Sequence, residues 1–171
     1  MSTRQRLLTV RLLVIGLSAL SIAATATLLA PSARAASRPG CPQALKHRSA
    51  QQTISEHLAL LQAGRVDEAM CDYAEDAVVL LPGQTVRGLA SIRAGLSGVG
   101  ALLGGGIPQI QTLTATDDVV LLTFNAFGVP CTIPDGSDTY VVEKGQIVTQ
   151  TVHDTFHSAP GFVCPLAAPG T

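Results

Sequence analysis

Apolar residues recur at helical spacing in the stretch that begins near position 48. Ile54, Leu58 and Leu61 predict a helix over residues 48–63, with polar side chains on its other side. Gly64 follows and should end this helix. A short connection then leads to a second helix, and two helices joined this closely form an antiparallel hairpin.

The second helix is expected to be shorter than the first. Asp67 is placed to cap its start, and Ala69, Met70 and Tyr73 should point inward from it. A third helix is predicted over residues 89–96, where two apolar residues stand one turn apart.

The rest of the chain, to about position 157, has the composition and alternation of strands. We predict strands over residues 77–81, 109–116, 119–127, 139–143 and 146–157. The glycine-rich residues 97–107 should be an irregular connection, and residues 130–138 a loop. Strands joined by short turns form an antiparallel meander. The order predicts an α+β fold, a cone-shaped curved antiparallel sheet covered by three N-terminal helices.

The first 35 residues have the order of a secretion signal. Arg4, Arg6 and Arg11 precede an uncharged stretch over residues 12–30, and the small-residue pattern of residues 33–35 is typical of a cleavage site. A retained membrane anchor is the alternative, because the uncharged stretch is long enough to span a bilayer. We expect a signal peptide and a secreted or extracytoplasmic protein.

Removing the signal peptide changes the charge balance. Four arginines leave with it, so seven of the 11 Lys and Arg residues remain against 12 Asp and Glu residues. No stripe of basic side chains remains to bind phosphates, so nucleic acid is not expected as a partner. Stable membrane insertion after cleavage is not expected either. Residues 36–47 should form an irregular segment, residues 48–157 the domain, and residues 158–171 an irregular tail.

Four cysteines follow the signal peptide, and an even number in an oxidising compartment predicts two disulfides. These are Cys41, Cys71, Cys131 and Cys164. Three pairings are open, and four free thiols are the alternative. The helical hairpin brings the segment before the first helix towards the second, which favours Cys41 with Cys71. Cys131 and Cys164 follow strands that run in the same direction, which favours the other pair.

Several short motifs resemble one family when they are taken in order. They are the run His57–Asp67, then Tyr73–Val78, Pro82-Gly83, Val86-Arg87-Gly88 and Ile92-Arg93. This order resembles the nuclear transport factor 2-like superfamily, in its SnoaL-like and ketosteroid isomerase-like branches. The resemblance is dense over residues 50–96 and rests on strand order from there to about position 157.

The resemblance also implies where the chemistry of the steroid isomerases is missing. Their helix tyrosine falls at His57, their base aspartate at Leu81, and their remaining acid at Asp138 or Thr139. Leucine cannot abstract a proton. The chain is therefore similar to those enzymes in shape and departs from them in chemistry.

The last strand offers a set of residues for the interior of the cone. Its alternation puts Gln150, Val152, Asp154 and Phe156 on one face. The resemblance implies that this face looks into the cone, that one face of the long strand joins it, and that His57 looks down from the first helix. The expected ligand-binding residues are Tyr73, Thr123, Asn125, Phe127, Gln150, Val152 and Phe156.

Three functions fit this arrangement. The first is a pocket protein that binds a small, mainly apolar molecule. The second is an isomerase, dehydratase or cyclase-type enzyme in which His57 and Asp154 are catalytic. The third is a homodimeric interaction module. In the alternative interpretation of the same two residues, Asp154 is hydrogen-bonded near the sheet end and His57 is an ordinary helix histidine.

No cofactor and no metal ion is expected. His153 and His157 share a face of the last strand but stand roughly 13 Å apart along it, too far for one ion. Asp135 and Asp138 lack the spacing of a calcium loop and are interpreted as turn residues.

Overall fold

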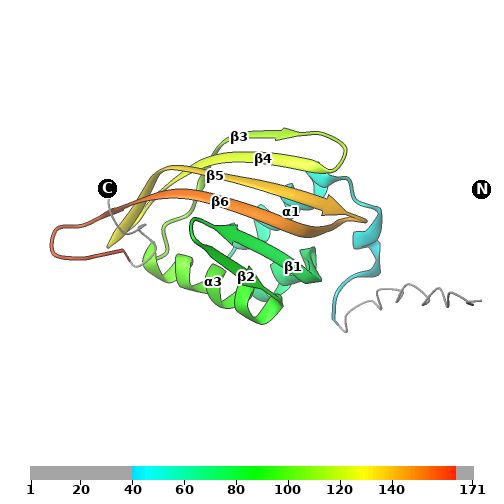
Figure 1. The fold of residues 1–171 in the computed structure, drawn as a ribbon, viewed down its shortest axis with the longest axis horizontal. Helices are drawn as coiled ribbons and strands as arrows, with labels where there is room; N and C mark the ends of the chain where they lie inside the picture. Colours follow the sequence, from blue (N-terminus) through cyan, green and yellow to red (C-terminus); the bar gives the residue numbers. More distant parts are fainter. Residues whose placement is uncertain (1–39, 165–171) are drawn as a thin grey trace, which may run out of the picture. The chain divides into compact units, whose positions relative to one another are not determined.

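The computed structural model describes residues 40–164, in which helices pack on one face of a curved six-stranded sheet (Figure 1). The helical elements are the 3-10 helix η1 (Gln43–His47), α1 (Ala50–Gln62), α2 (Val66–Ala69), the 3-10 helix η2 (Met70–Asp72) and α3 (Leu89–Leu102). The predicted α+β class with three α-helices is confirmed. The expected signal peptide lies outside the described residues.

The strands are β1 (Tyr73–Leu81), β2 (Gln84–Arg87), β3 (Gln109–Ala115), β4 (Val119–Phe127), β5 (Cys131–Glu143) and β6 (Gln146–Ser158). Two strands, β1 and β5, are longer than the sequence pattern suggested, and the other predicted strands agree with it to within one residue. The order of the strands across the sheet is β2-β1-β6-β5-β4-β3. Every neighbouring pair is antiparallel except β1 and β6, which run parallel, so the sheet is mixed.

The first helix begins at a capping box. The Ser49 hydroxyl accepts from the Gln52 amide, and the Gln52 side chain accepts from the Ser49 amide, which satisfies two backbone donors at the helix start. From this cap α1 runs across β4, β5 and β6, and it lies behind them in Figure 1. Its buried side carries Thr53, Ile54 and His57 towards the sheet.

Cross-strand register defines the helix-covered face of the sheet, here called the inner face. Leu122, Asp138 and Val152 are aligned across β4, β5 and β6, and so are Val120, Tyr140 and Gln150, and Phe124, Gly136 and Asp154. These residues are buried or half-buried, whereas Thr151, His153 and Thr155 between them are exposed. The predicted alternation of the last strand is therefore present.

The third helix corrects the prediction for the glycine-rich stretch. Residues 97–102, expected to be irregular, continue α3. Ile92, Leu96, Val99 and Leu103 recur at helical spacing and pack into the core. Burial of these side chains outweighs the helix-propensity cost of two glycines, about 1 kcal/mol each.

Residues 130–138, expected to form a loop, lie mostly within β5. Pro134 and Asp135 are exposed at a point where the register of β5 shifts against both neighbouring strands. A β-bulge absorbs the extra residue and keeps Ile133 and Gly136 on the buried side. Turn-forming residues here mark a bulge in a continuous strand, not a break between strands.

Smaller differences occur at the N-terminal side of the domain. η1 lies within the segment expected to be irregular, β2 was not predicted, and Tyr73 begins a strand instead of extending the second helix. Asp67 does not cap α2; it lies in the first turn and pairs with Arg93 of α3.

Both expected disulfides are present. Cys41 is joined to Cys71 with a Cα–Cα distance of 5.5 Å, and Cys131 is joined to Cys164 with a Cα–Cα distance of 6.0 Å. Each links the sheet or its helices to a terminal segment of the domain. None of the helices between residues 40 and 164 has the length and apolar character needed to cross a membrane.

Candidate functional site

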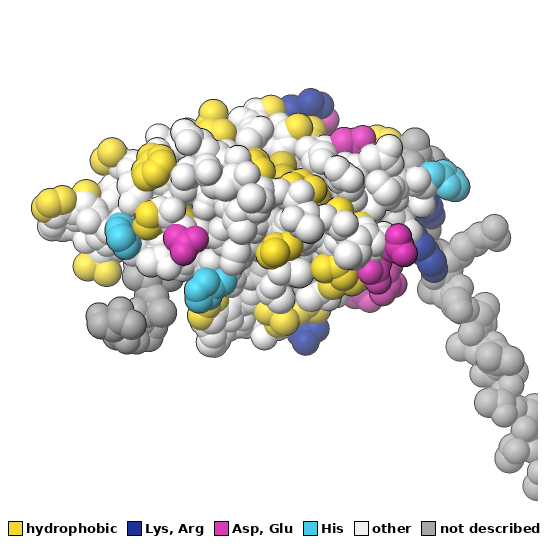
Figure 2. Space-filling model, turned by 90° about the horizontal axis from the view of Figure 1, so that it is seen from above, with side chains coloured by type: hydrophobic (Ala, Val, Ile, Leu, Met, Phe, Trp, Pro, Cys, Tyr) yellow, Lys and Arg dark blue, Asp and Glu magenta, His cyan; other side chains and the backbone are white. Residues whose placement is uncertain are grey.

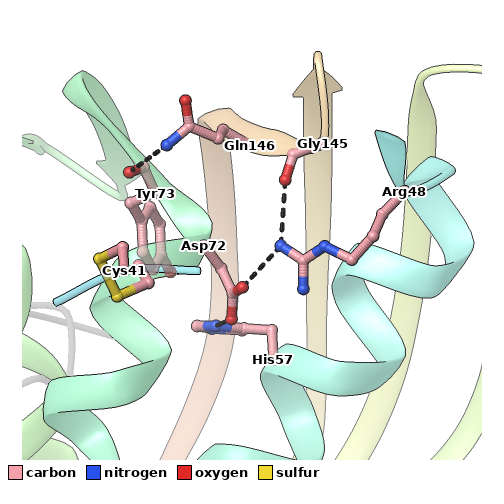
Figure 3. The surroundings of a disulfide bond; sticks show 8 residues. Cys41, Arg48, His57, Asp72, Tyr73, Gly145 and Gln146 are labelled. Atoms are coloured by element: carbon pink, nitrogen blue, oxygen red, sulfur yellow. Dashed lines mark hydrogen bonds and ion pairs between the residues drawn. A yellow bond between two sulfur atoms is a disulfide. The ribbon is translucent and has the colours of Figure 1, made fainter. Parts of the chain in front are cut away.

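A buried acid–base pair joins the first helix to the segment before β1. His57 is fully buried, and its Nδ1 lies 3.2 Å from Asp72 Oδ2. Asp72 is also buried, and its Oδ1 accepts from Arg48 Nη2 at 2.7 Å. Figure 3 shows the Asp72 carboxylate between the imidazole and the guanidinium. Because the oxygens of a carboxylate only accept hydrogen bonds, we assign Nδ1 of His57 as the donor to Asp72.

Local structure fixes each member of this arrangement. Arg48 stands just before the capping box of α1, and its Nη2 also donates to the carbonyl of Gly145 at 3.1 Å. Gly145 has φ +72°, and a Cβ there would lie 1.8 Å from the carbonyl oxygen of Leu45. Only glycine lets the β5–β6 turn approach η1 this closely. The Cys41–Cys71 disulfide holds the residue directly before Asp72.

A second polar network lies on the inner face. Tyr73 donates to Gln150 Oε1. Gln150 Nε2 and Tyr140 OH both donate to Asp138 Oδ2, at 2.8 Å and 2.9 Å. The His57 ring lies edge-on to both tyrosines, with ring centroids 5.2 Å from Tyr73 and 6.3 Å from Tyr140. The two networks are therefore neighbours within one interior.

Asp154 lies on the inner face one step further along the sheet. It is half-buried and aligned with Gly136 of β5. A Cβ on Gly136 would lie 2.7 Å from the Phe124 ring and 3.0 Å from Asp154 Oδ1. The missing side chain at position 136 thus makes the space in which an aromatic ring and a carboxyl group lie side by side.

Four buried side-chain atoms have no hydrogen-bond partner among the described residues. Three of them belong to this interior, namely His57 Nε2, Asp138 Oδ1 and Asp154 Oδ1, and the fourth is Asn125 Oδ1 of β4. Buried polar atoms are nearly always hydrogen-bonded, and an unpaired one costs about 1–3 kcal/mol. Unpaired atoms on three elements of one interior can hydrogen-bond to a polar group of a molecule that enters it.

Burial changes the acidity of the two inner-face carboxyl groups. It raises the pKa of Asp138 to about 6, against the opposing effects of the Tyr140 and Gln150 hydrogen bonds and of His57. Burial, followed by the charge of Asp138, raises the pKa of Asp154 to about 7. Burial also raises the pKa values of Tyr73 and Tyr140, so both phenols stay protonated. Asp154 can therefore exchange a proton near neutral pH.

The structure contradicts one group of expected inner-face residues. Thr123, Asn125 and Phe127 alternate with the buried Leu122, Phe124 and Ala126, so they lie on the outer face. Thr123 bonds Thr112 there, and Phe127 is 59 % exposed. The first half of β4 is apolar on both faces, so its sequence pattern does not show which face is buried, and Asn125 was placed on the inner face by the resemblance.

The other expected residues lie in the interior, although Tyr73 lies there at the start of β1 and not on the second helix. Tyr73, Gln150, Val152, Asp154 and Phe156 are buried or half-buried on the sheet, and His57 faces them from α1. Their roles in binding or catalysis stay predictions.

Sequence reasoning missed three members of the networks, namely Arg48, Asp72 and Tyr140. Asp138 was named, with Thr139, as the position of the remaining acid of the steroid isomerases, but it was interpreted as a turn residue because the bulge in β5 was not recognised. A signal was available: Asp138, Tyr140 and Val142 alternate in the sequence just as the buried residues of β5 do. Nothing in the sequence pairs Asp72 with Arg48, because the contact joins residues far apart in the chain.

Other surface features do not coincide with this interior. A shallow hollow lies on the exposed side of α1, lined by Ser49, Gln51, Gln52, Ser55 and Glu56. Among residues 40–164, no group of His, Cys, Asp and Glu side chains is arranged to hold a metal ion. Figure 2 shows only scattered basic side chains on the face it presents, and hydrophobic side chains projecting at its left end.

Comparisons with known proteins match the fold. The model of the SnoaL-like domain matches residues 54–150, more than half of the 171 residues. An NTF2-like protein of unknown function from Cytophaga hutchinsonii ATCC 33406 is 16% identical, with a TM-score of 0.54 over 62% of this chain and 89% of that one. No curated protein matches this chain.

Two further similar structures carry functional names. A putative polyketide cyclase from Sinorhizobium meliloti is 14% identical, with a TM-score of 0.53 over 59% of this chain and 93% of that one. The epoxide hydrolase/cyclase-like enzyme SalBIII, of pyran ring formation in polyether salinomycin, is 16% identical, with a TM-score of 0.54 over 61% and 88%. At such identities the likeness shows the fold alone.

Proposed function

Because the chain belongs to the SnoaL-like domain family, we propose that it is an exported protein that binds a small, mainly apolar molecule on the inner face of its sheet. The observation that carries this proposal is the set of three unpaired buried atoms, His57 Nε2, Asp138 Oδ1 and Asp154 Oδ1. The family assignment agrees with the resemblance inferred from the sequence.

The surroundings of these atoms suit a guest that is apolar over most of its surface. Leu122 and Val152 flank Asp138 on the neighbouring strands, and Phe124 lies beside Asp154. Phe156 follows on the same face of β6. Binding sites for small molecules commonly combine such an apolar wall with a few oriented polar groups.

Export is the second part of the proposal. The order of charged, uncharged and small residues over positions 1–35 supports it. The disulfides Cys41–Cys71 and Cys131–Cys164 are consistent with it, because disulfides persist in oxidising compartments. Expression with a reporter fused after residue 171 would test it: culture medium or periplasm should contain the reporter, and an entirely cytoplasmic reporter would contradict export.

Binding is tested with a matched pair of probes, benzyl alcohol and toluene, which differ by one hydroxyl group. In two-dimensional NMR titrations of the disulfide-bonded protein, benzyl alcohol should shift inner-face amide signals and bind more tightly than toluene. The variant Val152→Trp fills the inner face and should abolish binding. Its control, Thr151→Trp, places the same side chain on the exposed face of β6 and should leave binding unchanged. Equal binding by both variants would contradict the proposal.

A second candidate function is acid–base catalysis of the isomerase, dehydratase or cyclase kind. The observations that favour it are the His57–Asp72 pair, which leaves His57 Nε2 unpaired, and the Asp154 carboxyl group of the same interior, whose pKa burial has raised to about 7. An oriented imidazole and a carboxyl group that titrates near neutral pH can act as base and acid.

An enolisable ketone, phenylacetone, tests the second candidate. In deuterated buffer the protein should speed exchange of the benzylic protons, followed by NMR, and His57→Gln and Asp154→Asn should each lose this acceleration. Asp135→Asn, which changes an exposed carboxylate on β5, is the control and should retain it. A rate equal to that of buffer would count against catalysis of this kind.

A further inference from the structure

We infer that the guest is a small organic cation, an amine with an apolar body, whose ammonium N–H groups donate to Asp138 Oδ1 and Asp154 Oδ1. This inference rests on the proposed binding function and names the chemical class of its ligand.

All three unpaired atoms are suited to accept hydrogen bonds. Asp138 Oδ2 already accepts two hydrogen bonds, whereas Asp138 Oδ1 accepts none from the described residues. Asp154 Oδ1 has none. His57 donates from Nδ1 to Asp72, which leaves Nε2 as an acceptor in the neutral ring. A guest with N–H donors complements these atoms, whereas a carboxylate or a ketone brings only further acceptors.

The charges around the unpaired atoms also favour a cationic guest. Arg48 is the basic side chain beside this interior, and its ion pairs go to Asp72 and Glu56. The ion pairs formed within residues 40–164 include neither Asp138 nor Asp154. These two carboxyl groups therefore lack a Lys or Arg partner, and Asp154 ionises against the charge of Asp138. A bound ammonium supplies the missing positive charge.

Register allows a single ammonium to reach both groups. Asp138 is aligned with Val152 and Asp154 with Gly136, so the two aspartates are diagonal neighbours on adjacent strands of one face. Side chains in that relation have Cβ atoms about 7–8 Å apart or less, within reach of one donor group between them. The Phe124 ring beside Asp154 and the Tyr140 ring beside Asp138 offer apolar and cation–π contact to the same guest.

The test compares three probes that share a benzyl or phenyl body: benzylamine, benzyl alcohol and benzoate. At pH 8 benzylamine should bind the disulfide-bonded protein about tenfold or more tightly than benzyl alcohol, as expected for charge-assisted hydrogen bonds, and benzoate should not bind. At pH 5 the advantage of the amine should disappear, because both aspartates then take up protons. His57, Asp72, Tyr73 and Tyr140 are the other titratable groups that face this site.

Variants separate the effect of the charge from the effect of side-chain shape. Asp154→Asn should weaken benzylamine binding about tenfold and change benzyl alcohol binding less than about threefold, since the amide keeps the shape and removes the charge. Asp135→Asn should change neither. If Asp154→Asn does not fold, Asp138→Asn and the pH 5 measurement on the unaltered protein make the same test.

The outcomes distinguish the two proposals. Benzyl alcohol binding as tightly as benzylamine at pH 8, or benzylamine binding unchanged in Asp154→Asn, would overturn the cation and leave the binding function standing. Failure of benzylamine, benzyl alcohol and toluene alike to bind would overturn both.

Discussion

Two polar clusters lie side by side beneath the same helix, and they treat buried charge differently. In the first, Asp72 has Arg48 on one oxygen and His57 on the other. In the second, Asp138 is bonded through one oxygen only, and Asp154 Oδ1 has no partner among the described residues. The first cluster joins elements that are distant in sequence. The second cluster leaves hydrogen-bond acceptors unpaired on an apolar face. These acceptors do not stabilise the free protein, and they suit a ligand that donates hydrogen bonds.

The largest expected effect comes from breaking the paired cluster. Asp72→Ala should lower the free energy of unfolding by about 3–5 kcal/mol, because it leaves the Arg48 guanidinium buried without its carboxylate and removes the acceptor for His57. Urea denaturation followed by circular dichroism measures the loss.

Glu56→Ala is the matched control for that variant. Glu56 pairs with the same arginine, but its side chain is 58% exposed, so its loss should cost less than about 1 kcal/mol. Similar losses in the two variants would show that burial does not decide the strength of this network.

Removal of either disulfide should have the next largest effect on stability. The paired cysteines are 30 and 33 residues apart in sequence. Because each disulfide restricts the unfolded chain to a similar extent, each should add about 3–4 kcal/mol to the free energy of unfolding. Replacing Cys41 and Cys71 by serine should cost more than replacing Cys131 and Cys164, because Cys71 directly precedes Asp72. Equal losses in urea denaturation would mean that the first disulfide does not help to hold the paired cluster.

The fold could be predicted wherever one periodicity was dominant. The period of α1 and the alternation of β6 were sufficient to place both elements. Prediction was wrong at residues 97–102 and 130–138, where glycine and proline suggested breaks. In both segments the burial of apolar side chains across the sheet decided the structure, and that depends on contacts distant in sequence.

Asp154→Asn is expected to stabilise the protein, in contrast to Asp72→Ala and the removal of either disulfide. Burial raises the pKa of Asp154 to about 7 from a usual value of 3.8. The folded state therefore holds this proton more tightly than the unfolded state, and stability is lost as pH rises from about 4 through 7. At pH 8 the variant should be more stable than the unaltered protein by about 1–3 kcal/mol, and at pH 4 the two should agree.

Urea denaturation at pH 4, 6 and 8 follows this difference, and Asp135→Asn serves as the exposed control. A constant difference between Asp154→Asn and the unaltered protein at all three pH values would contradict the assignment of an unpaired, titrating carboxyl group to the inner face.

The candidate site was less predictable than the fold. His57, Gln150 and Asp154 were identified because a helix and a strand with clear periods carry them. Asp72 and Arg48 were not, since their partnership depends on how the helices close over the sheet. Asp138 was not placed on the inner face, because its strand contains a bulge. Strand register decides which residues of different strands lie together in a site. A single sequence does not determine that register.

The smallest expected effect concerns the outer face of β4. Thr123 bonds only the exposed Thr112, with 2.6 Å between the two hydroxyl oxygens, so Thr123→Ala should change stability by less than about 0.5 kcal/mol. It should also leave the affinity for benzylamine within about twofold, whereas Val152→Ala on the inner face should weaken binding by removing apolar contact. Calorimetric titration of both variants measures the contrast. A loss in Thr123→Ala equal to that in Val152→Ala would show that β4 presents its other face to the ligand, which would restore Thr123, Asn125 and Phe127 to the site.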